Sequence, residues 1–382
     1  MKSIILTGGG TAGHIMPNLA LLPEIEKYFD KIYYLGGSNS MEQKIISEYK
    51  NIEFIEIPTT KLVRKITLKN LAIPFKLINS IHKTKKIIKR ISPNVIFCKG
   101  GFVSVPVAIA GKICKVPVVS HESDLSMGLA NKVILRFAKR VCTTFKDTAI
   151  ISKKCVVTGT PIRKQIFSGK PERVKNKFSY DKNKPFILFF GGSLGSQFIN
   201  NLVKTSLNEL CKNYNVLHIT GKGNKINLQS LQSDIAKQNN KAHNDIKNNK
   251  TDNKLNAQEF KFDNYYQIEF TNSIQDYFAC SDIVICRGGA NSLFELLALK
   301  KPTLIIPLSK AQSRGDQIEN AVYFKKHYLS EVLQEENANT NSLLEKINKL
   351  NKNKQNILFT LCENKIDSNK KIVDIIVKNA KN

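Results

Sequence analysis

The chain repeats one pattern of apolar and polar positions. A short, continuously apolar run rich in β-branched residues ends in glycine, and in most cases a stretch with helical spacing of apolar residues follows. Five such runs stand out: SIILTGGG, VIFCKGG, CVVTGTP, FILFFGGS and DIVICRGG. Short buried strands that alternate with helices are typical of parallel sheets with crossover helices. The pattern therefore predicts an α/β fold in which ligands lie at the carboxyl ends of strands.

The repeats fall into two sets, and a chain of 382 residues is long enough for two hydrophobic cores. A polar stretch separates the sets, and a second polar stretch, dominated by Asn, Lys, Gln and Asp, reads as a surface insertion. Near the end, KIVDIIVKN has the periodicity of a docking helix. The predicted organisation is an N-terminal domain (1–162), a linker (163–184), a C-terminal domain (185–355) with the insertion at 224–262, and a tail with the docking helix (356–382).

Cysteine usage and hydropathy limit the class of protein. The eight cysteines form no C-x-x-C pair and have no interleaved histidine spacing, so disulfides and structural zinc are not expected. No apolar run approaches the roughly 18 residues of a membrane helix, and the first residues do not resemble a signal peptide. These features lead us to expect a cytoplasmic protein.

The formal net charge of +28 is compatible with nucleic-acid binding, but Lys, Asn and Ile are abundant throughout the chain, which compositional drift of the coding sequence would also produce. The distribution of charge is more informative. No Asp or Glu occurs between Ile57 and His121, and residues 61–90 interleave ten Lys or Arg with apolar residues. Basic groups beside exposed apolar groups suit an anionic membrane surface. A solvated helix face over an ordinary core explains the same pattern, and both interpretations stay open.

The first glycine run, Gly8 to Gly13, satisfies G-x-G-x-x-G between a strand and a helix. Glycines let backbone N–H groups approach an anion, and the helix N-terminus adds positive dipole charge. A dinucleotide site also needs an acidic residue about 20 positions on, yet the second strand ends at Leu35 and Gly36. The pattern therefore favours a phosphate over NAD or FAD. The alternative is a tight turn that serves helix packing alone.

A second glycine run, Gly191-Gly192-Ser193-Leu194-Gly195, matches G-x-S-x-G after a strand. This motif is typical of a hydrolase nucleophile elbow, and Asp282 and His327 follow in the permitted order. It also suits a phosphate, with the Ser193 hydroxyl and backbone amides as donors. The Walker lysine is absent, which excludes a nucleoside triphosphatase loop.

A third stretch, CRGGANSLFE, places Glu295 about one turn into a helix. Its carboxylate there suits the two hydroxyls of a nucleotide ribose. Locally the favoured interpretation is different, because Ser292-Leu293-Phe294-Glu295 reads as an S-x-x-E capping box.

Taken together, the motifs resemble those of the bacterial MurG family. GGGTAGHIMP, KGGFVSVP, SHES with GLANK, TGTPIR, GGSLGS, RGGANSLFE and GDQIENA occur in that family's order and approximate spacing, over nearly the whole chain except the insertion and tail. The family transfers N-acetylglucosamine from its UDP conjugate to the lipid-linked peptidoglycan precursor. The resemblance implies the GT-B fold, with two Rossmann-like domains facing across a cleft. The C-terminal domain would hold the donor and the N-terminal domain the lipid acceptor.

For the donor, the resemblance implies that Ser193 contacts the diphosphate, Glu295 the ribose and Gln317 the sugar. Arg163 would lie near the diphosphate, where a fixed guanidinium stabilises the charge that the departing UDP gains. The remaining expected donor contacts are Gly191, Gly192 and Ala290. No D-x-D pair occurs in the chain, so neither a metal nor another cofactor is expected.

For the acceptor, the resemblance implies an inverting displacement by the C4 hydroxyl of the muramyl sugar. His14 is the expected base, and Glu122 is the alternative. The first glycine loop would cradle the acceptor diphosphate, and the expected contacts are Gly10, Thr11, Gly13, Gly101, Ser104 and Asp124. The implied partners are UDP-N-acetylglucosamine, the undecaprenyl-pyrophosphoryl-muramyl-pentapeptide (lipid I) and the cytoplasmic face of the inner membrane, without nucleic acid.

The chain departs from the family pattern at three places. Ser123-Asp124 stands where Gln-Asn is usual, Thr160 replaces an Asn, and Asp316 precedes Gln317 where His or Gln is usual. Asp124 adds a carboxylate where an anionic acceptor is expected to bind.

Overall fold

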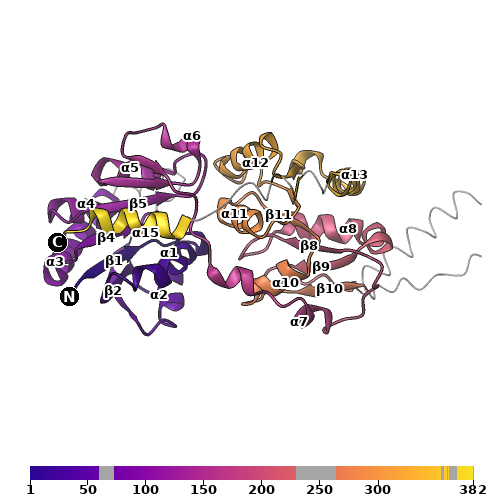
Figure 1. Ribbon diagram of the computed structural model, residues 1–382, viewed down its shortest axis with the longest axis horizontal. Coiled ribbons are helices and arrows are strands. Elements are labelled where there is room, and N and C mark those ends of the chain that lie inside the picture. Colours follow the sequence, from indigo (N-terminus) through magenta and orange to yellow (C-terminus); the bar gives the residue numbers. More distant parts are fainter. Residues whose placement is uncertain (60–72, 229–263, 354–356, 359, 361–367, 382) are drawn as a thin grey trace, which may run out of the picture. The chain divides into compact units, whose positions relative to one another are not determined.

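The computed structural model describes residues 1–59, 73–228, 264–353, 357, 358, 360 and 368–381. By contact the chain divides into two compact units (Figure 1). The first unit comprises residues 1–166, 289–298 and 364–382, and the second comprises 167–288 and 299–363. Most of the predicted insertion and the first part of the basic 61–90 stretch lie outside the described residues.

The first unit is built on a seven-stranded sheet in the order β3-β2-β1-β4-β5-β6-β7, and every pair in it is parallel. The strands are β1 (Ser3–Thr7), β2 (Lys31–Gly37), β3 (Ile52–Ile57), β4 (Val95–Cys98), β5 (Val118–Glu122), β6 (Arg140–Thr143) and β7 (Cys155–Val157). Its helices are α1 (Ala12–Ile25), α2 (Met41–Ile46), α3 (Ile73–Ile91), α4 (Ser104–Ile113), α5 (Leu129–Phe137), α6 (Lys146–Ala149), α11 (Ala290–Ala298) and α15 (Ser368–Asn379).

The central strands of this sheet are buried on both faces, which explains why their sequences are continuously apolar rather than alternating. The register aligns their carboxyl ends, since Thr7 pairs with Leu35 on one side and with Cys98 on the other. On the next strand, Ser120 pairs with Cys98. The loops after β1, β4 and β5 therefore lie at one edge of the sheet.

Helix α15 completes the core of the first unit. Its residues Ile372, Val373 and Ile376 belong to the same buried cluster as Ile4 and Leu6 of β1. In Figure 1 the yellow α15 lies alongside α1. The periodic stretch near the end of the chain thus forms a helix whose apolar residues pack against β1.

The second unit contains a six-stranded parallel sheet in the order β10-β9-β8-β11-β12-β13. The strands are β8 (Phe186–Phe190), β9 (Asn215–Ile219), β10 (Tyr265–Ile268), β11 (Ile283–Cys286), β12 (Thr303–Ile305) and β13 (Glu331–Val332). Its helical elements are η2 (Lys164–Ser168, which begins in the first unit), α7 (Glu172–Lys175), α8 (Gln197–Asn213), α10 (Ile274–Cys280), α12 (Asp316–Lys326), η3 (Glu335–Asn337) and α13 (Thr340–Lys352).

Both sheets confirm the α/β architecture that the apolar runs predict. All five runs that end in glycine form strands, namely β1, β4, β7, β8 and β11. In the part of the chain that the structure describes, no helix has the length and apolar character needed to cross a membrane.

Candidate active site

The opening glycine loop follows β1 and is shaped by close packing. A Cβ atom on Gly8 would lie 2.7 Å from the backbone oxygen of His14, and one on Gly9 would lie 2.5 Å from Glu42 Oε1. Gly10 has a φ of +85°. These positions exclude side chains, so the glycines serve the turn itself as well as any ligand.

Glu42 holds this loop from its buried side. Its side chain is 2% exposed, and its carboxylate accepts hydrogen bonds from Gly10 N at 3.3 Å and Gly37 N at 3.2 Å. The Gly10 amide, expected to face a phosphate, is thus directed at a protein carboxylate. Tyr34 supports the same loop by donating a hydrogen bond to Gly8 O. The sequence pattern missed both residues, because they follow the loop by more than 20 positions without any motif of their own.

His14 is held by the loop that precedes it. Its Nδ1 lies 3.0 Å from Gly9 O and 3.2 Å from Thr11 Oγ1. A carbonyl oxygen only accepts hydrogen bonds, which assigns the proton to Nδ1 and leaves Nε2 as the basic nitrogen. The half-buried ring is flanked by the exposed Thr11 and Gly13. The tautomer suits a general base.

The loop after β4 meets the loop after β1 at His14. Gly101 has a φ of +78°, and a Cβ atom there would lie 2.4 Å from Gly9 O and 3.3 Å from His14 Nδ1. Ser104 is fully buried, and its hydroxyl donates to Gly100 O at 2.8 Å. The Ser104 side chain therefore shapes this loop and offers no exposed hydroxyl to an acceptor.

Glu122 ends β5 with a carboxylate that organises the following loop. It is 5% exposed and accepts hydrogen bonds from Asp124 N at 3.0 Å, Gly128 N at 2.9 Å and Asn131 Nδ2 at 2.9 Å. These donors come from the loop after β5 and from α5, so the carboxylate holds the start of α5 against the end of β5.

His121 is fully buried beside Glu122, and its Nε2 lies 2.9 Å from Gly159 O. Burial and the charge of Lys99 lower the pKa of His121 well below its usual value. The imidazole is therefore neutral, and it positions the backbone of the Thr158–Thr160 loop.

Arg163 and Glu295, two expected donor contacts, bind each other. Arg163 Nε donates to Glu295 Oε1 at 2.7 Å, and Nη2 donates to Oε2 at 2.9 Å, a bidentate pair within the first unit. The capping-box interpretation of Glu295 is wrong, since α11 begins at Ala290 and Ser292 lies inside the helix. The Ala290 side chain is buried at the start of that helix.

Asn291, also on α11, links the start of α1 to the loops after β5 and β7 of the first unit. Its Oδ1 accepts from Ser123 Oγ at 3.0 Å and from Thr160 Oγ1 at 3.1 Å, and its Nδ2 donates to Gly13 O at 3.0 Å. Two of the departures from the family pattern, Ser123 and Thr160, are thus partners of one amide.

The second glycine loop follows β8 and leads into α8. Gly192 has a φ of +89°, and Gly191 and Gly195 approach backbone atoms too closely for a Cβ, at 2.4 Å from Ser196 N and 2.2 Å from Thr220 O. Ser193 is exposed, and Ser196 caps α8 by accepting from Ile199 N. The loop presents Ser193 at a helix N-terminus, a position that suits an anion.

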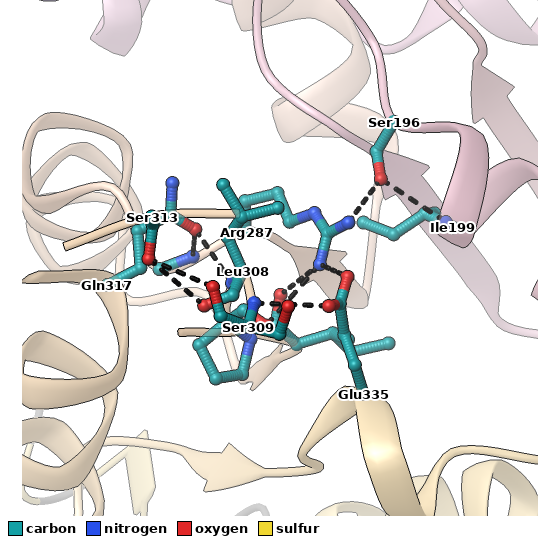
Figure 2. A network of polar contacts seen from close by, with 11 residues as sticks. Ser196, Ile199, Arg287, Leu308, Ser309, Ser313, Gln317 and Glu335 are labelled. Carbon is teal, nitrogen blue, oxygen red and sulfur yellow. Dashed lines mark hydrogen bonds and ion pairs between the residues drawn. The ribbon is translucent and has the colours of Figure 1, made fainter. Parts of the chain in front are cut away.

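Arg287 ties this loop to two other segments of the second unit (Figure 2). Its Nη2 donates to Ser196 Oγ at 2.6 Å, and its Nη1 lies 2.6 Å from Glu335 Oε1 and donates to Ile306 O at 3.2 Å. Glu335 Oε2 in turn accepts from Ser309 N at 3.1 Å. Sequence reasoning missed this buried pair, because its partners lie 48 positions apart.

Gln317 lies at the start of α12 and joins two backbone segments (Figure 2). Its Oε1 accepts from Gly288 N at 3.2 Å and Leu308 N at 3.1 Å. Among the described residues its Nε2 has no protein partner, so the amide nitrogen is the end available to a ligand. The neighbouring Asp316 forms an ion pair with Arg314 at 3.6 Å.

The hydrolase alternative is wrong. Asp282 lies at the amino end of β8, where its backbone N donates to Phe186 O at 2.8 Å and its Oδ2 accepts from Phe186 N at 2.9 Å. Ser193 follows the carboxyl end of the same strand. A strand of five residues spans about 16 Å, which separates Ser193 from Asp282 by at least that length of strand. A Ser-His-Asp relay through Asp282 therefore cannot form.

The structure shows no group of three or more His, Cys, Asp or Glu able to hold a metal within its described ranges. The residues expected to act on the donor and acceptor supply amides, hydroxyls, carboxylates, one imidazole and one guanidinium.

Comparison with known proteins agrees with this arrangement. The glycosyltransferase family 28 N-terminal domain matches residues 4–143, and the C-terminal domain of that family matches residues 186–376. Relatives from Clostridium botulinum (strain Hall) and Clostridium tetani are each 42% identical, over 382 and 384 residues, and cover 99% of this chain and 99% and 98% of their own. Both are named UDP-N-acetylglucosamine--N-acetylmuramyl-(pentapeptide) pyrophosphoryl-undecaprenol N-acetylglucosamine transferase.

Solved structures share the fold. MurG of Acinetobacter baumannii matches with a TM-score of 0.73 at 21% identity, covering 99% of this chain and 100% of its own. A UDP-GlcNAc 2-epimerase from Neisseria meningitidis bound to UDP-GlcNAc matches with a TM-score of 0.65 at 14% identity, covering 99% of each chain.

Proposed function

This chain belongs to glycosyltransferase family 28 and, within it, to the MurG family, and from that premise we propose that it converts lipid I to lipid II. N-acetylglucosamine moves from UDP-N-acetylglucosamine to the C4 hydroxyl of the lipid-linked N-acetylmuramyl-pentapeptide. The observation that carries the proposal is 42% identity, over the full length of both chains, to transferases of this name. The GT-B architecture of two parallel-sheet Rossmann-like units supports it.

In the proposed reaction, the C4 oxygen attacks the anomeric carbon of the donor sugar and forms the new glycosidic bond. Nε2 of His14 takes the C4 proton, a role for which the hydrogen bond from Nδ1 to Gly9 O orients the ring. The bond between the anomeric carbon and the β-phosphate oxygen breaks, and its electron pair leaves with UDP. The displacement inverts the configuration at that carbon.

On the donor side, we assign Ser193 and the backbone of Gly191 and Gly192 to the diphosphate of UDP. The free Nε2 of Gln317 is assigned to the sugar. A loop held by glycines at a helix N-terminus supplies both the amides and the dipole that a diphosphate needs.

Glu295 is assigned to the ribose, and Arg163 to the charge that develops on UDP. The Glu295 carboxylate can accept further hydrogen bonds besides the two from Arg163, because each carboxylate oxygen has two lone pairs. Ala290 begins the same helix and supplies backbone rather than side chain.

On the acceptor side, we assign the diphosphate to the loop edge formed by Thr11, Gly13 and Gly101, beside His14. Gly10 supplies the left-handed turn, since its N–H is directed at Glu42. Asp124 flanks this edge in the loop after β5.

We further propose that the enzyme acts at the cytoplasmic face of the inner membrane as a peripheral protein. Helix α3 supports this location. Phe75 and Ile78 are 76% and 63% exposed there, beside exposed Lys and Arg and without any acidic residue on the helix.

Transfer of labelled N-acetylglucosamine from UDP to a synthetic lipid-linked muramyl acceptor tests the function. We expect His14→Ala to lower kcat by about 10²–10⁴-fold, because a positioned base contributes roughly that factor. The affinity for UDP should stay within about twofold in the same variant, and His327→Ala serves as the control histidine. Absence of transfer by the native protein would refute the function, whereas full activity of His14→Ala would refute only the base.

A further inference from the structure

The carboxylate of Glu42, on α2, is buried against the opening glycine loop. A dinucleotide site carries an acidic residue near the end of its second strand, but β2 ends in Gly36 and Gly37, and the acidic residue comes later, at Glu42. A Cβ atom on Gly9 would lie 2.5 Å from Glu42 Oε1, and one on Gly36 would lie 2.8 Å from Glu42 Cγ. These glycines therefore make room for the Glu42 side chain.

The turn between β2 and α2 fixes the direction of this carboxylate. Ser40 donates from Oγ to Gly37 O at 2.7 Å and caps α2 by accepting from Gln43 N at 3.2 Å. Glu42 Oε1 accepts from Gly37 N at 3.2 Å in the same turn. One oxygen of the carboxylate is thus held by the turn, and the other, Oε2, reaches the opening loop.

The hydrogen bond to the opening loop ends on the same peptide unit that holds His14. Glu42 Oε2 accepts from Gly10 N at 3.3 Å, and this N–H belongs to the planar peptide unit whose carbonyl oxygen is Gly9 O. Gly9 O in turn accepts from His14 Nδ1 at 3.0 Å. A carboxylate, one peptide unit and an imidazole therefore form a continuous chain of hydrogen bonds. Hydrogen bonds in such a chain polarise one another, which strengthens Gly9 O as an acceptor.

Two further contacts restrict the peptide unit and the ring. Gly101, after β4, packs against the same carbonyl, since a Cβ atom there would lie 2.4 Å from Gly9 O. Thr11 Oγ1 lies 3.2 Å from His14 Nδ1, but a hydroxyl both donates and accepts, so this contact alone does not determine the tautomer. Gly9 O only accepts. The peptide unit is therefore the group that places the proton on Nδ1.

We propose that Glu42 is a positioning residue for His14 and acts through the peptide bond between Gly9 and Gly10. In a catalytic triad the carboxylate holds the imidazole tautomer by direct contact. Here the carboxylate orients a peptide unit, and that unit keeps the proton on Nδ1 and leaves Nε2 to accept a proton. The proposal rests on the proposed function, because that function gives His14 its role as the base.

Steady-state transfer by Glu42→Gln tests the proposal, because glutamine keeps the size of the side chain but replaces one acceptor oxygen with a donor. The new NH2 group must face Gly10 N or Gly37 N, and both are donors. We expect kcat to fall by about 10- to 100-fold, a part of the roughly 10²–10⁴-fold that a positioned base contributes. The donor KM should stay within about twofold, because the loop assigned to the donor diphosphate belongs to the second unit.

Glu56→Gln is the matched control. It makes the same change of charge at an exposed carboxylate that contacts the same helix, since Glu56 Oε1 accepts from Gln43 Nε2 at 2.8 Å. Its kcat should stay within about twofold of the native value. Equal losses of kcat in the two variants would overturn the proposal. A rise in the donor KM of Glu42→Gln as large as its loss of kcat would also overturn it.

Nitrogen NMR of protein with labelled histidines reads the tautomer of His14 at a pH where the ring is neutral, and His14→Ala assigns the signals. We expect the proton on Nδ1 in the native protein and a mixture of both tautomers in Glu42→Gln, a change that a loss of stability alone would not produce. An unchanged tautomer in a folded Glu42→Gln would overturn the proposal. A native ring with its proton on Nε2 would overturn it even if Glu42→Gln does not fold.

The NMR measurement also separates this proposal from the proposed function, because it needs no substrate. Native protein that transfers no sugar, but in which His14 changes its tautomer when Glu42 is replaced, would refute the proposed function and support the hold of Glu42 on His14.

Discussion

Gly101 lies where the loop after β4 meets the loop after β1, and its lack of a side chain lets the two backbones touch. We expect Gly101→Ala to lower kcat/KM of transfer by roughly 10²-fold, because the new methyl group lies 2.4 Å from Gly9 O and displaces the loop that holds His14. Gly223→Ala is the matched control. Gly223 has a similar φ of +73° but no atom within 4 Å of its Cβ position.

Transfer kinetics of both variants, with circular dichroism to verify folding, measure this effect. Equal losses in the two variants would mean that backbone strain alone is responsible, which would contradict the steric explanation.

Residues next to a glycine motif were predictable, and residues that reach the motif from elsewhere were not. The position of His14 follows from its place after the loop, and the structure holds it there. Glu42 and Tyr34 contact the same loop from later elements, and only the three-dimensional register brings them close. The prediction that Ser292 caps a helix was wrong, because the local pattern does not determine the residue at which a helix begins.

At the scale of elements, the buried pair of Arg287 and Glu335 holds the end of β11, the start of α8 and the segment after β12 together. We expect Arg287→Met to lower the free energy of unfolding by about 3–5 kcal/mol, because it leaves Glu335 buried without its partner. Arg314→Met, which removes the more exposed pair with Asp316, should change it by less than about 1 kcal/mol.

Urea unfolding measures both values. In a double variant with Glu335→Gln, the loss should be smaller than the sum of the two single losses. Strict additivity would show that the two side chains act independently.

His218 makes the second unit sensitive to acid. It is buried between Asn200 of α8 and Tyr265 of β10, with ring nitrogens 3.0 Å from each, and burial lowers its pKa to about 3. The unfolded chain, with a histidine pKa near 6.5, therefore binds more protons than the native state at pH values between these two. The free energy of unfolding that the neutral His218 contributes is fully present above pH 6.5. It decreases as the pH drops toward 3, by up to about 4–5 kcal/mol.

Urea unfolding between pH 7 and pH 4 tests this expectation. His218→Gln should be less stable than the native protein at pH 7 but should lose less stability on acidification. A parallel decline of both proteins would assign the acid sensitivity to other groups.

Strands that end in glycine were evident in the sequence, and others were not. Two of the edge strands, β3 and β13, lack such a signal, since β3 has Glu53 and Glu56 among its apolar residues and β13 has two residues. Their place in the sheets depends on pairing with neighbours, which a local pattern does not specify.

At the scale of the molecule, the proposed association with a membrane surface assigns a role to the basic residues of α3. We expect reversal of Lys83, Lys86 and Arg90 on α3 to glutamate to weaken binding to vesicles that contain anionic lipid, because each basic group contributes about 1 kcal/mol near such a surface. The same reversal of Lys370, Lys371 and Lys378 on α15 changes the net charge equally and should have a smaller effect.

Vesicle co-sedimentation at two salt concentrations measures the binding, with the affinity for UDP as a check on the fold. Equal losses in the two triple variants would indicate that net charge rather than α3 determines binding.

The division into two sheets was predictable from the two sets of apolar runs, but the assignment of segments to units was not. Residues 289–298 belong to the first unit although they interrupt the second unit in the chain. Residues 364–382 also belong to the first unit although they follow the second. Such contacts depend on packing between segments that are distant in sequence.

The docking of α15 has a consequence for synthesis on the ribosome. The cluster that contains Ile4 and Leu6 stays incomplete until Ile372, Val373 and Ile376 emerge, which at about 5–20 residues per second is roughly 20 to 75 s later. The half of the enzyme that is translated first is therefore the half that matures last. Its apolar surface stays exposed until the C-terminal helix has been synthesised. A prematurely terminated chain would therefore leave that surface accessible to chaperones and proteases.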